Sequence, residues 1–131
     1  MKKIVAYTAL PLMALLLLGF GLFEPLKGTW QNPNGQTIRF TKGNQCEWIL
    51  SSGGRSDTFR ITYHYEKTSK TTGILDLGPF NRGYLKGKTL YGIVEWSKKK
   101  DSFRYDAEPG KTDKVRPKAM NPDQVQTYQR Q

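Results

Sequence analysis

The chain has 131 residues, enough for one domain with a modest core, and its 21 lysine and arginine residues exceed its 11 acidic residues to give a net charge of +10. Such a balance favours anionic partners, namely lipid headgroups, acidic polymers, nucleic acid or an acidic protein; a basic surface with no particular partner is the alternative. The single cysteine, Cys46, excludes an intramolecular disulfide, and one histidine, His64, is too few for a metal site. We therefore expect no metal and no other cofactor.

An apolar run covers residues 4–23 and carries no charge. Its length, about 20 residues, can cross a bilayer as a helix. A secretory signal has a shorter apolar region and a small-x-small cleavage site, for which residues 19–21 are a poor candidate. We expect residues 1–27 to be an uncleaved signal-anchor transmembrane helix with a short juncture; a cleaved signal is the alternative. In either case Lys2 and Lys3 stay cytoplasmic, so the domain lies on the extracytoplasmic side, in a periplasm, a lumen or at a cell surface.

The chain after the anchor predicts short strands divided by turns. Residues 28–31, 36–41 and 45–51 are the first three strands, and Asn34-Gly35 between the first two is a strong hairpin signal. Residues 52–57 contain two glycines and are predicted to be a loop.

The central predicted strand is residues 58–66. Inward apolar side chains alternate there with polar ones at a period of two, which is typical of a strand with one buried face. The apolar members are Phe59, Ile61, Tyr63 and Tyr65.

Further strands are predicted at residues 74–77, 89–96 and 102–107, with a small edge strand at residues 84–86. From residue 108 the chain is rich in proline and charge and poor in large apolar side chains. Because such a segment buries too little to offset its ordering entropy, residues 108–131 are predicted to be a disordered tail. The folded domain is thus expected at residues 28–107.

Short strands with tight turns predict an all-β fold, a small antiparallel meander barrel or curled sheet of seven or eight strands. The opening Gly28-Thr29-Trp30 resembles the Gly-x-Trp start of lipocalins and their calycin relatives, including avidin-like barrels. The resemblance implies that Trp30 plugs one end of a barrel and that the barrel carries a small apolar ligand.

The aromatic side chains predicted to face inward form either the core or the lining of a ligand cavity, and the size of the domain favours the core. They include Trp30, Trp48, Tyr63, Tyr65 and Trp96. Aromatic residues interleaved with basic ones could also bind single-stranded nucleic acid, but export from the cytoplasm makes that partner unfavourable.

Catalysis has little support in the sequence. A nucleophile and its base must lie within hydrogen-bond reach, whereas strand alternation turns Cys46 inward and His64 outward. The acidic residues are scattered and form no carboxylate pair for hydrolysis. We therefore expect a protein that is not an enzyme.

Successive turns of a meander alternate between the two ends of the sheet. Counting the predicted strands gathers six lysines beside the membrane anchor, where they would face anionic headgroups or an acidic membrane partner; a solvated set of turn lysines is the alternative. The six are Lys27, Lys42, Lys67, Lys70, Lys86 and Lys88.

These features together predict a membrane-anchored, extracytoplasmic, non-catalytic binding or accessory domain. Its role would be that of a subunit, or an assembly or stability factor, of a membrane protein complex. The alternative is a lipocalin-like carrier of a small apolar ligand.

Overall fold

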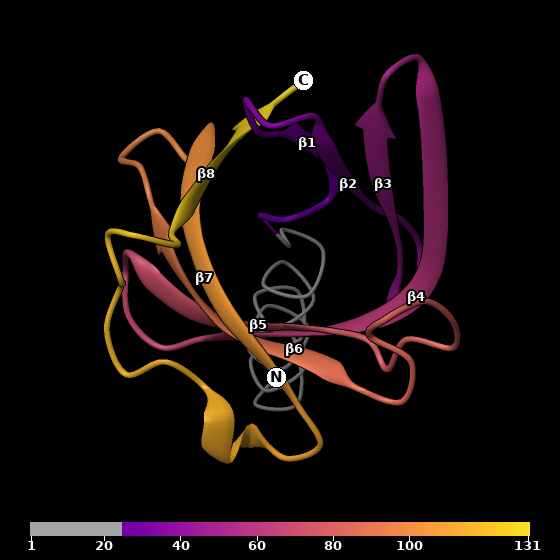
Figure 1. The fold of residues 1–131 in the computed structure, drawn as a ribbon. Coiled ribbons are helices and arrows are strands. Elements are labelled where there is room, and N and C mark those ends of the chain that lie inside the picture. Colours follow the sequence, from indigo (N-terminus) through magenta and orange to yellow (C-terminus); the bar gives the residue numbers. More distant parts are fainter. Residues whose placement is uncertain (1–24) are drawn as a thin grey trace, which may run out of the picture.

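The computed structural model describes residues 25–131, which form a closed antiparallel barrel of eight strands. Each strand pairs with the next along the chain, and the last pairs with the first (Figure 1). The strands are β1 (Gly28–Gln31), β2 (Gln36–Phe40), β3 (Gln45–Ser52), β4 (Arg55–Lys67), β5 (Thr72–Leu77), β6 (Thr89–Trp96), β7 (Ser102–Gly110) and β8 (Gln126–Arg130).

The predicted all-β meander is confirmed as a closed eight-stranded barrel with almost no helix; Asp113–Val115 form a single 3₁₀ turn, η1. The predicted transmembrane helix falls on residues 1–24, outside the described part of the chain. Within residues 25–131 no helix has the length and apolar composition needed to cross a bilayer.

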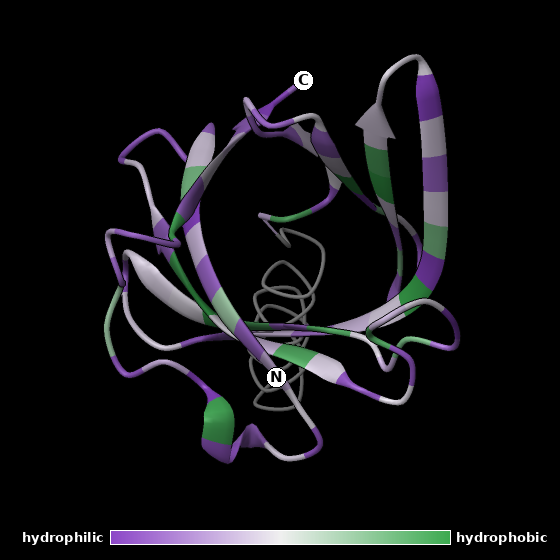
Figure 2. Cartoon of the chain, viewed as in Figure 1, coloured by the Kyte–Doolittle hydropathy of each residue, from purple (hydrophilic) through white to green (hydrophobic). Residues whose placement is uncertain are grey.

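Strand β4 shows why these residues form a barrel wall. Phe59, Ile61 and Tyr63 are buried, while the residues between them, Arg60 and Thr62, are exposed. The alternation is visible as bands of contrasting hydropathy along β4 (Figure 2). A strand with this pattern buries one face only, so the sheet closes around that face.

The turn between β3 and β4 is shorter than predicted. Arg55, Ser56 and Asp57, expected in a loop, pair with Ser52, Ser51 and Leu50 as part of β4. Gly53 and Gly54 alone connect the strands, with φ of 58° and 78°. Two consecutive residues at positive φ form the tight hairpin turn whose twist matches the strands, and glycine takes that conformation without steric cost.

The predicted edge strand at residues 84–86 is absent, and only an isolated bridge joins Phe80 to Lys86. The Phe80 and Leu85 side chains are instead buried in the barrel. Backbone bonds from Phe80 N to Lys88 O (2.9 Å) and from Gly87 N to Phe80 O (2.8 Å) close the connection into a compact loop. The chain therefore leaves and re-enters the barrel at the same end.

The prediction of a disordered tail is wrong for the described chain. Strand β7 continues to Gly110, and β8 pairs with both β7 and β1 to close the barrel. Tyr128 is the buried residue of β8, and its ring stacks on Phe103 at 5.3 Å. The buried Tyr128 and the two hydrogen-bonded neighbouring strands thus help to order a segment that is rich in polar residues.

Residues 111–125 connect β7 to β8 over the outside of the barrel, and we call this segment the strap. Arg116 forms an ion pair with Asp76 and donates to the Gly92 carbonyl at 2.9 Å. The Asp76 carboxylate raises the pKa of Arg116. Further along, the buried Asp106 carboxylate accepts from Gln124 Nε2 at 2.6 Å and from the Asn121 amide at 2.8 Å. The strap is thus tied to the wall at two places.

Candidate functional site

The inward aromatic residues pack on one another. The Trp30 ring lies 5.6 Å from Trp96 and 4.8 Å from Phe103, and the Phe40 and Tyr63 rings lie 4.8 Å apart. Four of the five candidates, Trp30, Trp48, Tyr63 and Trp96, are buried. Edge-to-face contacts at these separations are those of a packed core.

Tyr65, the fifth candidate, is half-buried and accepts a hydrogen bond from Trp96 Nε1 at 3.0 Å. Its ring lies over Gly73, where a Cβ atom would be 2.6 Å from the ring. The glycine therefore makes room for Tyr65 against the wall.

One end of the barrel is closed around Trp30. Its indole Nε1 donates to the Leu26 carbonyl at 2.7 Å, and Leu26 itself is fully buried. The Arg130 guanidinium lies 4.2 Å from the Trp30 ring and donates to the carbonyls of Pro25 (2.8 Å) and Lys27 (2.9 Å). The beginning and the end of the described chain are thus joined at this end.

The side chains of Cys46 and His64 lie on opposite sides of the barrel wall, as predicted. Cys46 is 2% exposed, whereas the His64 side chain is 65% exposed and lies 3.5 Å from the Glu66 carboxylate. The wall keeps the thiol away from the imidazole, so the two cannot act as nucleophile and base.

The Cys46 thiol is expected to be unreactive in the folded protein. Burial, together with the nearby Glu47 carboxylate, raises the pKa of Cys46 from 9.0 to about 12. Near neutral pH we expect iodoacetamide to alkylate the urea-unfolded chain far faster than the native one, because the thiolate is the nucleophile. Equal rates would contradict the burial of Cys46.

The same shift sets the direction of a pH effect on stability. Because the folded-state pKa of Cys46 is the higher one, its contribution is complete below the unfolded-state pKa, near 9.0, and is lost as pH rises toward about 12. A Cys46→Ala variant is expected to lose less stability than the parent across that alkaline range, as urea titrations at several pH values will measure.

Four of the six predicted lysines lie at the end of the barrel where the described chain begins. Lys27 precedes β1, Lys42 lies between β2 and β3, and Lys67 and Lys70 lie at the turn between β4 and β5. Antiparallel neighbours make these connections fall at a single end.

Lys86 and Lys88 were predicted at the same end, and this prediction is wrong. Both lie in the connection between β5 and β6, which is at the opposite end of the barrel. Because the strand predicted at residues 84–86 is absent, each later connection lies at the end opposite to the predicted one.

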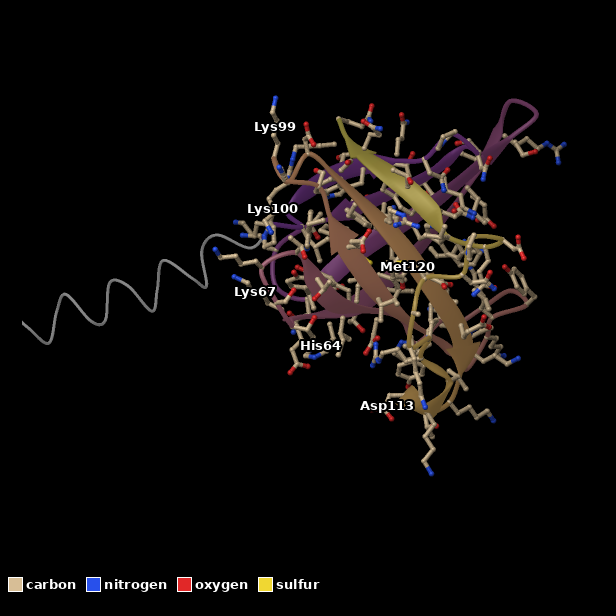
Figure 3. The ribbon with its side chains drawn as sticks, turned by 90° about the vertical axis from the view of Figure 1, so that its left-hand side faces the viewer. His64, Lys67, Lys99, Lys100, Asp113 and Met120 are labelled. Carbon is tan, nitrogen blue, oxygen red and sulfur yellow. The ribbon has the colours of Figure 1, made fainter. Side chains whose placement is uncertain are left out.

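Three lysines that were not among the six predicted ones lie at the first end. Lys98, Lys99 and Lys100 follow β6, and Lys100 Nζ donates to the Lys70 carbonyl at 2.6 Å. Lys67, Lys99 and Lys100 lie together at one end of the barrel (Figure 3). We call this set the basic end: Lys27, Lys42, Lys67, Lys70, Lys98, Lys99 and Lys100.

The charge of the basic end is largely uncompensated. Across residues 25–131, the basic side chains of the ion pairs are arginine or histidine, so the lysines of the basic end have no carboxylate partner. The nearby acids are Glu66, beside His64, Glu95, which is paired with Arg104, and Asp101, which accepts from Ser97 Oγ at 2.9 Å. Unpaired ammonium groups on one surface create a positive potential over about a Debye length, roughly 8–10 Å.

At the opposite end Lys86, Lys88 and Lys111 likewise have no carboxylate partner within residues 25–131, but one arginine is paired. Arg82 forms a 2.6 Å ion pair with Asp57 and stacks over Phe59 at 4.2 Å. This hydrogen-bonded pair lowers the pKa of Asp57. The same end presents Tyr84, which is 82% exposed.

Comparison with known protein families, curated proteins and solved structures finds no match to this chain. Within residues 25–131 no group of histidine, cysteine and carboxylate side chains could hold a metal ion.

Proposed function

We propose that this protein is a membrane-anchored, extracytoplasmic binding or accessory domain without catalytic activity. It would serve as a subunit, or as an assembly or stability factor, of a membrane protein complex. The anchor is residues 1–27, and the basic end of the barrel rests on anionic headgroups at the surface of the same membrane.

The observation that carries the proposal is the position of the basic end. The uncharged run at residues 4–23 ends just before Pro25, and Pro25 is bonded to Arg130 at this end. A bilayer holding that run as a helix would lie close to seven lysines without carboxylate partners. Each lysine near an anionic surface contributes about 1 kcal/mol, so the set orients the barrel on the membrane.

The accessory role is supported by the opposite end, which would point away from the bilayer. Tyr84 is exposed there, and tyrosine is among the residues enriched in protein interfaces. This end is therefore the surface offered to a partner subunit.

A calycin relationship is part of the same proposal. It rests on Gly28-Thr29-Trp30 at the start of β1, on the meander order of the closed barrel and on the burial of Trp30 at one end. The packed aromatic interior favours a binding domain that uses its surface over a carrier with a ligand inside.

Vesicle binding tests the proposal. Residues 25–131 contain every strand of the barrel, and this fragment is expected to sediment with phosphatidylglycerol vesicles at low salt and to release at high salt. Reversing Lys67, Lys70 and Lys99 to glutamate is expected to weaken binding about 100-fold or more, since each reversal replaces attraction by repulsion.

The matched control reverses Lys86, Lys88 and Lys111 at the opposite end, with the same change in net charge. We expect this variant to retain most of its affinity. Equal losses from the two triple variants would mean that only net charge matters, and the oriented basic end would be rejected.

A further inference from the structure

The outer wall of the barrel carries a groove beside the strap. It has a volume of about 500 Å³, within the range of small-molecule sites. Its floor is formed by Ile74 and Ile93, outward residues paired across β5 and β6, and Met120 and Ala119 of the strap form one side. Met120 lies over the strands on the side of the barrel (Figure 3). Two isoleucines on an outer barrel face are thus covered only in part.

The groove is polar where it approaches the basic end. Thr68 and Thr72 line it there, and their hydroxyls are 2.7 Å apart. Lys67 and Lys70 flank Thr68 in the turn between β4 and β5, and Lys100 reaches the same turn through the Lys70 carbonyl. The Thr68 end of the groove therefore lies next to the turn that carries Lys67 and Lys70, while the lysines of the basic end are not among its lining residues.

Cationic side chains also border the rest of the groove. Lys118 is exposed and has no carboxylate partner within residues 25–131, whereas Arg104 is paired at 2.8 Å with Glu95, which also lines the groove, and Arg116 is paired with Asp76. The groove thus combines an apolar floor with one uncompensated cation, Lys118, at its rim.

We propose that this groove binds one acyl chain of an anionic membrane phospholipid. The phosphate meets the hydroxyls of Thr68 and Thr72 and the ammonium groups of Lys67 and Lys70. The chain extends along Ile74 and Ile93 under Met120. An amphiphile matches both parts of the groove: an apolar tail removes the isoleucines from water, and an anionic head is attracted to unpaired lysines.

This inference rests on the proposed function, because the lipid would come from the membrane on which the basic end is proposed to lie. It adds a defined site on the side of the barrel. A diffuse attraction between lysines and headgroups has no need of Ile93 or Met120, so the two claims are separable by experiment.

The test uses the full chain in nanodiscs that contain phosphatidylglycerol and phosphatidylcholine. A photo-crosslinking residue replaces Met120, and intact mass identifies the lipid attached after irradiation. The control places the same residue at Ile49, another half-buried, outward isoleucine that lies on β3 outside the groove. We expect a phosphatidylglycerol adduct at position 120, beyond the share of that lipid in the nanodisc, and little adduct at position 49.

Variants in the background of the Met120 crosslinker test the floor of the groove. Ile93→Asn is expected to lower the adduct yield about tenfold, because the chain then contacts a polar amide. Ile49→Asn is the matched substitution elsewhere on the wall and is expected to leave the yield unchanged. Lys118→Glu, a change at an exposed position that will not unfold the barrel, is also expected to lower the yield.

The outcomes separate the two proposals. If the adduct at position 120 does not exceed that at position 49 while vesicle binding still depends on the basic end, lipid binding in the groove is rejected. The proposed function is retained in that case. Loss of both signals overturns both. Equal adducts with phosphatidylcholine and phosphatidylglycerol overturn the requirement for an anionic head.

Discussion

Deletion of residues 126–131 is expected to abolish cooperative folding of the barrel. The deletion removes β8, which pairs with β1 and β7, and it removes the Tyr128 ring from its stack on Phe103. It also removes Arg130, whose guanidinium covers Trp30 and bonds to the carbonyls of Pro25, Lys27 and Lys100. These losses together are comparable to the total stability of a small domain, about 5–15 kcal/mol.

Far-UV circular dichroism and urea titration of the deleted chain will measure this effect. Thr127→Ala serves as the control, because it changes an exposed side chain of β8 and keeps the strand. A disordered tail would make the deletion neutral. An unchanged urea midpoint would therefore contradict the closure of the barrel by β8.

Replacement of Trp48 by alanine is expected to lower the free energy of unfolding by about 3–5 kcal/mol. Trp48 is 7% exposed, and its ring lies 6.0 Å from Phe59 and 5.5 Å from Phe80. The substitution leaves a cavity between β3, β4 and the loop that fills the barrel end.

The neighbouring residue provides the control for Trp48. Ile49 is next in sequence but points outward and is half-buried, so Ile49→Ala is expected to cost much less. Urea titration of both variants will compare them. Similar losses from the two substitutions would mean that the inward face of β3 is misassigned.

The wall of the barrel could be predicted from the sequence because its signals are local. A period of two in β4 places Phe59 and Tyr63 inside, and the same parity in β3 places Cys46 and Trp48 inside. The Asn34-Gly35 pair likewise marked the connection between β1 and β2. Each of these inferences depends only on residues a few positions apart.

Strand β8 could not be predicted in the same way because closure is a long-range event. Its only buried side chain is Tyr128, and its partner β1 lies at the other end of the described chain. The segment is ordered by two hydrogen-bonded neighbours and by the contact between Arg130 and Trp30, which no local pattern reports.

Only part of the basic end could be predicted, because the end at which a turn lies depends on every strand before it. Lys27, Lys42, Lys67 and Lys70 were placed correctly because every strand before them was identified. The strand wrongly predicted at residues 84–86 then led to Lys86 being predicted at this end and to Lys99 being left out of it. Leu85 is the buried apolar residue of that predicted strand, and it fills the barrel end from a loop.

The central claim is that the basic end faces the membrane, and the distance of two labelled positions from the headgroups tests it most directly. Spin labels are attached to cysteines that replace Lys99 in one variant of the full chain and Lys86 in another, and these positions lie at opposite ends of the barrel. The native Cys46 is buried, so we expect it to remain unlabelled. In phosphatidylglycerol nanodiscs with a paramagnetic nickel-chelating lipid, we expect strong relaxation enhancement at position 99 and little at position 86. Equal enhancement at both positions, or a stronger effect at position 86, would contradict the proposed orientation.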